Sequence, residues 1–168
     1  APQPVEVLSR AGYVVAVAAG DSCSFALTRE GATYSWGHGA SGHAAEDGDM
    51  FTTHALPTLV TALSHVRVVA VATSSFGPGH TLAVAADGVV YAFGAGDNGA
   101  LGIGSEGHVT EPTPIQTLLD ARVFVQAVSV GSGHSIALGA DGDLFGWGYG
   151  ADEGLGLELE GDQLVPKR

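Results

Sequence analysis

Three segments of the 168-residue chain repeat one pattern of residue types. Each segment has a β-branched apolar run, a run that alternates small or polar with apolar residues, an acidic residue followed by glycine, and an aromatic residue followed by glycine. Self-similarity at a regular spacing is typical of architectures that stack one supersecondary unit, so the repeat limits the possible folds strongly. The three copies span residues Val14–Gly42, Val68–Gly99 and Val125–Gly154.

The residue types within each copy predict short antiparallel strands. Runs such as His134–Leu138 alternate small or polar with apolar residues, which is typical of a half-buried strand. An acidic residue followed by glycine predicts a two-residue type I′ hairpin turn, in which both central residues need a positive φ. A proline-containing segment near the end of each copy predicts a fourth, outer strand, because proline is tolerated at a sheet edge. The three predicted turns are Glu30-Gly31, Asp87-Gly88 and Asp141-Gly142.

The predicted fold is therefore all-β, with about three propeller-like blades of four antiparallel strands each. The chain reads as a single domain of three repeats, over residues 5–60, 61–116 and 117–168. No segment has a helical period longer than two turns, and residues 56–63 and 114–119 come nearest. An open stack of three blades leaves two apolar faces and free strand edges, which predicts self-association or contact with further blades or a protein partner.

The charge balance argues against nucleic acid as a partner. The chain has 6 Lys and Arg against 18 Asp and Glu, a formal net charge of −12. Binding to phosphates needs clustered Lys and Arg, and the acidic balance instead favours basic partners. Cys23 is the only cysteine, so an internal disulfide is impossible and an intracellular location is expected. No apolar run reaches the length of a membrane helix, so no membrane partner is expected.

The repeat resembles that of the regulator of chromosome condensation repeat family. Three elements carry the resemblance: a Gly-x-x-His start to the second strand, best seen at Gly131–His134; the acidic-Gly turn leading to aromatic-Gly; and the loop Gly99–Gly104. The first copy has Cys23 in the histidine position, and the second has His80. The resemblance implies a closed propeller, usually of seven blades, that recognises proteins. Its best-known member also implies guanine nucleotide exchange on a small GTPase, coupled to chromatin attachment.

A glycine pattern in the second copy matches the dinucleotide-binding fingerprint without its structural setting. Gly94, Gly96 and Gly99 follow a predicted strand, but no helix follows them to bind a pyrophosphate. The same spacing recurs in the first copy at Gly37, Gly39 and Gly42, so loop geometry explains it better than a cofactor. No cofactor is therefore expected.

No cluster in the sequence predicts catalysis or a metal. His38, His43 and His54 with Asp47 and Asp49 form the one His-carboxylate cluster, but they lie in a predicted glycine-rich loop without a fixed ligand geometry. The chain has no Gly-x-Ser-x-Gly motif, and no third group accompanies Cys23 and a histidine as a catalytic set. We expect no catalytic residue and no metal site, and so a chain that is not an enzyme.

The loops after the aromatic-Gly pairs vary between copies while the strands do not, which predicts partner contacts there. The expected function is a protein–protein interaction module, with an exchange-factor fragment or a structural subunit of a larger assembly as alternatives. His80 and His134 share one repeat position and are expected to be structural. The predicted partner contacts are His38, His43, Asp97, Asn98, Tyr149, Asp152 and Glu153. The predicted structural repeat residues are Gly31, Gly37, His80, Gly88, Gly94, His134, Gly142 and Gly148.

Overall fold

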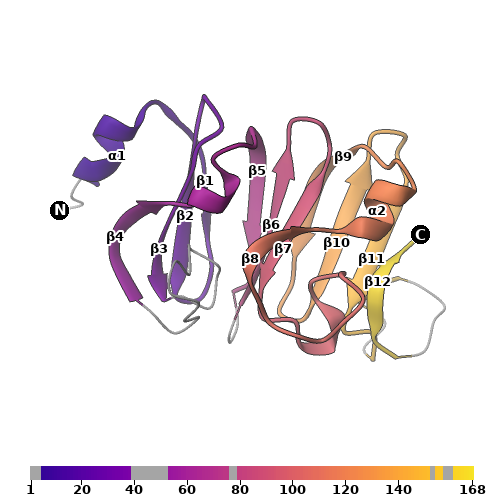
Figure 1. The fold of residues 1–168 in the computed structure, drawn as a ribbon. Coiled ribbons are helices and arrows are strands. Elements are labelled where there is room, and N and C mark those ends of the chain that lie inside the picture. The colour runs from indigo at the N-terminus through magenta and orange to yellow at the C-terminus, as the bar shows by residue number, and fades with distance from the viewer. Residues whose placement is uncertain (1–4, 39–52, 76–78, 152–153, 157–160) are drawn as a thin grey trace.

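The computed structural model contains three four-stranded antiparallel sheets that stand side by side (Figure 1). It describes residues 5–38, 53–75, 79–151, 154–156 and 161–168. Each sheet is one blade, with its four strands paired in chain order. The predicted all-β fold of propeller-like blades is confirmed.

Each blade lies within one of the three repeats predicted from the sequence. Its first three strands have five or six residues, and its fourth strand pairs with the third alone. Blade 1 contains β1 (Val14–Ala19), β2 (Cys23–Thr28), β3 (Thr33–His38) and β4 (Thr53–Leu59). Blade 2 contains β5 (Val68–Thr73), β6 (His80–Ala85), β7 (Val90–Gly94) and β8 (Val109–Pro114). Blade 3 contains β9 (Val125–Val130), β10 (His134–Gly139), β11 (Leu144–Gly148) and β12 (Gln163–Lys167).

The hairpin between the second and third strands has a different turn from the one predicted. Within the described residues, Asn98 and Arg122 are the non-glycine residues with a positive φ, so Asp87 does not adopt the conformation that a type I′ turn requires. Instead the Gly88 amide donates to the Ala85 carbonyl at 2.9 Å, and the Ala85 amide donates to the Val89 carbonyl at 2.8 Å. This is a three-residue loop, a type I turn that Gly88 closes with φ +85°. The other two blades repeat it, so the type I′ prediction is wrong.

Short helices connect the blades. Helix η2 (Thr61–Leu63) lies between blades 1 and 2, and α2 (Gln116–Asp120) lies between blades 2 and 3. Helix η3 (Asp97–Gly99) lies in the loop after β7. The sequence analysis found no helical period longer than two turns, with residues 56–63 and 114–119 coming nearest, and it did not predict α1 (Glu6–Ala11), which precedes blade 1. None of these helices exceeds two turns, and no described helix is long and apolar enough to cross a membrane.

The hydrophobic core lies between the blades. One cluster joins Phe25 and Leu27 of blade 1 to Ala83 and Phe93 of blade 2, and the two phenyl rings lie 6.2 Å apart. A second cluster joins blade 2 to Trp147 and other residues of blade 3. Each blade is therefore stabilised by its neighbours, as in other repeat proteins.

Two rims follow from this arrangement (Figure 1). The hairpin rim carries the β2–β3, β6–β7 and β10–β11 turns with η2 and α2. The loop rim is the opposite edge, where each third strand ends and each fourth strand begins. Of the predicted partner contacts that the structure describes, Asp97 and Asn98 lie in η3 and Tyr149 directly follows β11, all on the loop rim.

Candidate functional site

The last glycine of each third strand brings the loop rim close to the neighbouring turn. Gly148 has φ +98°, and a Cβ there would lie 2.5 Å from the Gly133 carbonyl oxygen. Gly37 has φ +104°, and a Cβ there would lie 2.2 Å from the Ser22 carbonyl oxygen. These positions therefore require glycine, both for the positive φ and for the close approach of two backbones. They fix where each variable loop leaves its blade.

A buried hydrogen-bond network, the inter-blade clasp, joins blade 2 to blade 3. The Ser135 hydroxyl donates to the Ala100 carbonyl at 3.0 Å, and the Trp147 indole N–H donates to the same oxygen at 2.9 Å. His80 Nε2 lies 2.8 Å from Ser135 Oγ. Because the serine proton is used on Ala100, His80 Nε2 carries the proton of this bond. The clasp anchors the base of the loop that contains Asn98.

His80 is neutral within the inter-blade clasp because it is buried. Burial, and to a smaller extent the charge of His134, lowers the pKa of His80 from 6.5 to about 4. A neutral imidazole with its Nε2 bonded to Ser135 acts as a structural group at neutral pH. The structural role of His80, predicted from its position in the repeat, stays a prediction that this buried hydrogen bond supports.

The histidine position differs among the three blades. In blade 1, Cys23 is buried and its Sγ lies 3.5 Å from Thr73 Oγ1, which also accepts a hydrogen bond from Thr81 Oγ1 at 3.0 Å. In blade 3, His134 is only half-buried among the described residues. The sequence predicts one role for His80 and His134, and the structure separates their surroundings.

Asp162 joins two loops of the loop rim. Its Oδ2 accepts a hydrogen bond from Asn98 Nδ2 at 2.7 Å, and its Oδ1 accepts one from the Gly150 amide at 3.1 Å. Asn98 has φ +58°, which asparagine tolerates better than most residues. Asp162 follows β11 by many residues and belongs to no repeated pattern, so the sequence analysis missed this role. His108, whose Nδ1 accepts from the Gly96 amide at 3.2 Å, was missed in the same way.

The structure places part of the predicted contact set on the loop rim. Asp97 and Asn98 lie in η3, and Tyr149 follows β11 with an exposed side chain. His38 is the last residue of β3, one blade away. Three predicted contacts lie outside the described residues: His43, Asp152 and Glu153.

The predicted structural glycines occupy two repeated positions. In the hairpin turns and at the third-strand ends, all six have a positive φ between +85° and +105°. The hairpin glycines are Gly31, Gly88 and Gly142, and the strand-end glycines are Gly37, Gly94 and Gly148.

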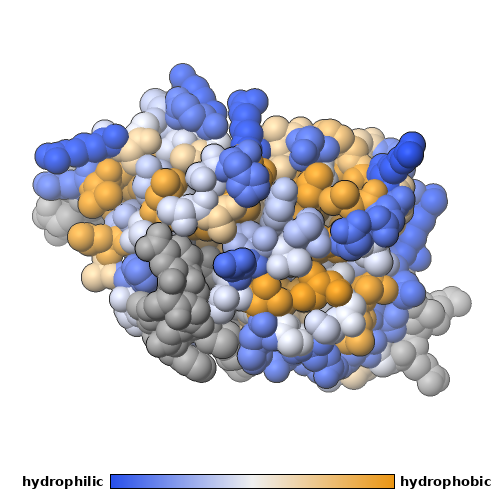
Figure 2. Space-filling model, in the orientation of Figure 1, coloured by the Kyte–Doolittle hydropathy of each residue, from blue (hydrophilic) through white to orange (hydrophobic). Residues whose placement is uncertain are grey.

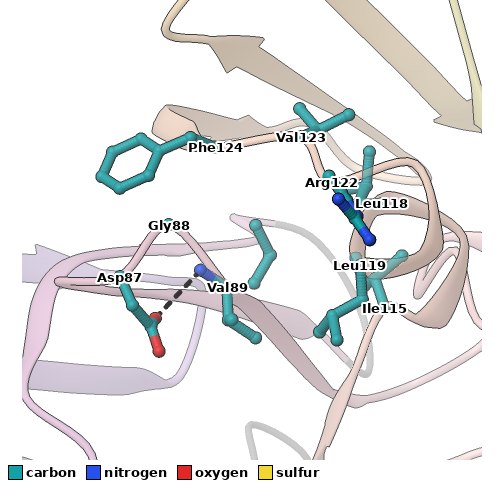
Figure 3. Close-up of a pocket in the computed structure, with 10 residues that line it drawn as sticks. Asp87, Gly88, Val89, Ile115, Leu118, Leu119, Arg122, Val123 and Phe124 are labelled. Atoms are coloured by element: carbon teal, nitrogen blue, oxygen red, sulfur yellow. Dashed lines mark hydrogen bonds between the residues drawn. The ribbon is translucent and has the colours of Figure 1, made fainter.

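The hairpin rim contains a pocket of about 180 Å³ between blades 2 and 3 (Figure 3). Its apolar floor includes Ile115 and Leu118, which are buried. Phe124 lies on one side and Leu119 and Arg122 on the other, with the Asp87 carboxylate bonded to the Val89 amide at 3.2 Å. No sequence pattern predicts this pocket, because its lining comes from a turn, a strand and a connecting helix.

An equivalent recess lies between blades 1 and 2, with a volume of about 440 Å³. Its lining includes Glu30, Gly31, Leu59 and Arg67. Each recess lies between the hairpin turn of one blade and the segment that leads into the next blade, so the recesses recur with the repeat. Among the described residues, no group of three or more His, Cys, Asp or Glu side chains could hold a metal ion.

The repeat and its inter-blade geometry correspond to a known family. The model of the regulator of chromosome condensation (RCC1) repeat matches residues 87–138, and a second model of this repeat matches residues 125–153. The chain belongs to the RCC1 repeat family. The resemblance seen in the sequence is therefore confirmed.

Curated relatives share the RCC1 repeats over most of this chain. The chain is 38% identical to the mouse E3 ubiquitin-protein ligase HERC2 over 158 residues, which is 92% of this chain and 3% of HERC2. It is 34% identical to the ultraviolet-B receptor UVR8 of Arabidopsis thaliana over 171 aligned residues, which is 99% of this chain and 37% of UVR8. The chain thus spans well under half the length of these relatives.

Solved RCC1-type structures have the same fold. Human WBSCR16 is 30% identical with a TM-score of 0.76, over 93% of this chain and 37% of that structure. Prp20p of Saccharomyces cerevisiae is 26% identical with a TM-score of 0.78, over 93% of this chain and 38% of that structure. The shape of the three blades is therefore that of a propeller segment.

Proposed function

We propose that this chain is a protein–protein interaction module that presents its loop rim to a partner. The observation that carries the proposal is the contrast within each RCC1 repeat. Strands and hairpins keep one geometry in all three copies, whereas the loops after Gly37, Gly94 and Gly148 differ in sequence. A rigid scaffold that presents variable loops is the usual arrangement of a recognition surface. The proposal includes no catalytic step.

The charge of the chain supports a basic protein as the partner. The net charge is −12, and Asp97 and Asp162 both lie on the loop rim. Complementary charge accelerates encounter and sets specificity, more than it sets affinity. The Prp20p structure was reported with the binding properties of that protein to Gsp1p and histones. Core histones are therefore a suitable basic probe.

The proposal is tested with immobilised core histones and a matched pair of double variants. Asp97→Ala with Tyr149→Ala removes one acid and one tyrosine from the loop rim. Glu30→Ala with Tyr13→Ala removes the same residue types from the hairpin rim, where Tyr13 stacks on Arg29 at 4.4 Å. We expect the loop-rim variant to bind about tenfold more weakly, a loss of about 1.4 kcal/mol, and the control to bind nearly as the parent chain does. Equal binding by all three proteins would reject the proposal.

A second candidate is guanine nucleotide exchange on a small GTPase. The similarity to Prp20p, reported with Gsp1p binding, favours this candidate. The test is the release of fluorescent GDP from Gsp1p with and without the chain. Faster release of GDP would support exchange activity, and an unchanged rate at saturating chain concentration would reject it. Neither result bears on the interaction-module proposal, which the histone experiment tests.

A further inference from the structure

The pocket between blades 2 and 3 on the hairpin rim, here the Phe124 pocket, has no role in the loop-rim proposal. Its lining comes from the β6–β7 turn, β7, α2 and the segment before β9, so both of its walls belong to the described structure. Ile115 and Leu118 form an apolar floor and are 1% and 4% exposed. A dry apolar cavity of about 150 Å³ holds a benzene molecule. The Phe124 pocket, at about 180 Å³, therefore has room for one large apolar side chain.

The walls of the Phe124 pocket are apolar side chains that remain exposed. Phe124 is 51% exposed and Leu119 is 41% exposed, and they lie on opposite sides of the pocket (Figure 3). An apolar side chain inserted between them would remove this surface from water, which favours binding. The face of the molecule in Figure 2 shows hydrophobic residues in separate patches divided by hydrophilic ones. The pocket therefore suits one inserted side chain rather than a broad hydrophobic interface.

Arg122 lines the Phe124 pocket from a backbone conformation that glycine usually supplies. The Val123 amide donates to the Leu118 carbonyl at 3.0 Å. The Arg122 amide donates to the Leu119 carbonyl at 2.9 Å, and the two bonds together form a Schellman turn at the end of α2. Arg122 is the left-handed residue of this turn, with φ +55°, whereas the connection into blade 2 has no residue with a positive φ. The repeat does not require this strained arginine, and strain beside a pocket points to a role in binding.

The guanidinium of Arg122 is available to an anionic ligand. No carboxylate among the described residues lies within ion-pair distance of it. The two nearby acids are bonded elsewhere: Asp87 accepts from the Val89 amide at 3.2 Å, and Asp120 accepts from the Gln116 side chain at 2.7 Å. Arginine binds carboxylates through charge-assisted hydrogen bonds, which are stronger than neutral ones. The pocket thus combines an apolar interior with a carboxylate-binding group at its edge.

The recess between blades 1 and 2 also contains an arginine, at a different position of the repeat. A Cβ at Gly31 would lie 2.9 Å from the Arg67 Cα. A Cβ at Gly88 would lie 2.9 Å from the Phe124 Cα, so Arg67 and Phe124 occupy equivalent positions. Arg67 likewise has no ion-pair partner in the part of the chain that the structure describes. Each recess therefore has an arginine, although the repeat itself does not specify one.

Every Lys and Arg of the chain lies at the strand ends that form the hairpin rim. They lie in α1 before β1, in the β2–β3 turn, in the segments before β5 and β9, or at the end of β12, where Arg168 pairs with Asp143. These residues are Arg10, Arg29, Arg67, Arg122, Lys167 and Arg168. Asp87 and Asp120 lie on the same rim, so its charge is mixed, whereas the whole chain has a net charge of −12. An acidic segment therefore meets less repulsion here than on the loop rim.

We infer that the Phe124 pocket binds an acidic linear segment of a partner protein. One apolar side chain of the segment inserts between Phe124 and Leu119, and an adjacent Asp or Glu carboxylate bonds to Arg122. The carboxylate belongs to a side chain rather than to a chain terminus, because both recesses contain an arginine and a segment has only one C-terminal carboxylate. This surface lies on the opposite rim from the one proposed to bind a basic partner, so the two proposals stand or fall separately.

The test titrates blocked peptides into the isotopically labelled 168-residue chain and follows the amide resonances of Val123 and Phe124 by NMR. The probe is acetyl-Gly-Phe-Glu-Gly-amide, and its two controls replace Glu by Gln or Phe by Ala. We expect the probe to bind about tenfold more tightly than either control, because each control lacks one of the two contacts. Equal binding of the Glu and Gln peptides would overturn the proposal. Tighter binding of acetyl-Gly-Gly-Phe with a free carboxylate would show a chain terminus to be the ligand instead.

Variants of the chain separate a specific contact from the charge of the rim. Arg122→Gln and Arg29→Gln each remove one positive charge from the hairpin rim, but only Arg122 lines the Phe124 pocket. We expect Arg122→Gln to bind the probe about tenfold more weakly and Arg29→Gln to bind it as the parent chain does. Arg122→Gly supplies the residue that a Schellman turn prefers, so it should lose the same binding while its urea midpoint equals or exceeds the parent's. Equal affinity of Arg122→Gln and the parent chain for the probe would reject Arg122 as the carboxylate ligand.

Discussion

At the residue scale, His80 shows how position within the stack changes a side chain's chemistry. It lies between two blades, where it is buried and donates to Ser135. His134 occupies the equivalent position in its own sheet, opposite Gly148 as His80 is opposite Gly94, but it is half-buried. The contact with Ser135 of the next blade distinguishes the surroundings of His80.

The lowered pKa of His80 makes the stability of the chain depend on pH. The unfolded chain binds a proton at this histidine near pH 6.5, whereas the folded chain resists it until about pH 4. Stability is therefore fully present above pH 6.5 and falls as the pH drops to about 4, by about 3 kcal/mol in total. The measurement is the free energy of unfolding in urea across this range. His80→Gln retains an N–H donor but does not titrate, so its free energy of unfolding should fall by about 3 kcal/mol less over this pH range than that of the parent chain. An equal fall in both proteins would show that His80 is not the titrating group.

Gly142 and Gly148 allow the cost of a strained φ to be compared with the cost of a steric clash, because their φ angles are similar but their surroundings differ. Gly148 and Gly142 have φ of +98° and +92°, but a Cβ at Gly142 would meet no atom within 4 Å, while one at Gly148 would meet the Gly133 carbonyl. Both substitutions by alanine should destabilise the chain, and Gly148→Ala should cost about 1–3 kcal/mol more than Gly142→Ala. Urea denaturation of both variants measures this difference. Equal losses would show that the loop can move away.

At the element scale, Asp162 sets the geometry of the loop rim. It bonds to Asn98 in one loop and to the Gly150 amide in another, so two loops from different blades share one carboxylate. A hydrogen bond to a charged group contributes about 1.5–3 kcal/mol. Asp162→Ala should therefore increase hydrogen exchange at the Gly150 amide by roughly tenfold or more.

The control for this experiment is Asp120→Ala. Asp120 also bonds to a side-chain amide, that of Gln116 at 2.7 Å, but it lies in α2 on the hairpin rim. Its removal should leave exchange at Gly150 unchanged. Faster exchange in both variants would indicate a general loss of stability rather than the release of a loop.

At the scale of the whole molecule, each blade is stabilised by the hydrophobic cluster that it shares with its neighbour. Phe25 of blade 1 contacts only the cluster shared with blade 2, whereas blade 3 packs through a different cluster. In such a linear stack, Phe25→Ala should lower the stability of blade 1 and its contact with blade 2 by about 3–5 kcal/mol. It should therefore lower hydrogen-exchange protection more in blade 1 than in blade 3. Exchange measured over β2 and β10 tests this. A uniform loss over both strands would mean that the three blades unfold as one unit.

The sequence was sufficient for most of the fold. The repeat, the alternation of apolar residues and the acidic-Gly pairs predicted the strands, their order and the outer position of the proline-containing strand. These signals are local, because a strand's pattern and a glycine's positive φ depend on neighbours in the chain. The turn type was wrong because Asp-Gly also suits the three-residue loop with glycine in its last position.

The amino-acid sequence alone determined that three alike β-units follow one another and which glycines their turns need. Only the tertiary structure decided which of two equivalent histidines is buried, that Asp162 joins two loops, and that a pocket lies beneath Phe124. These features depend on atoms brought together from different blades. A repeating pattern states what each blade contains, but the environment of each side chain depends on whether another blade lies against it.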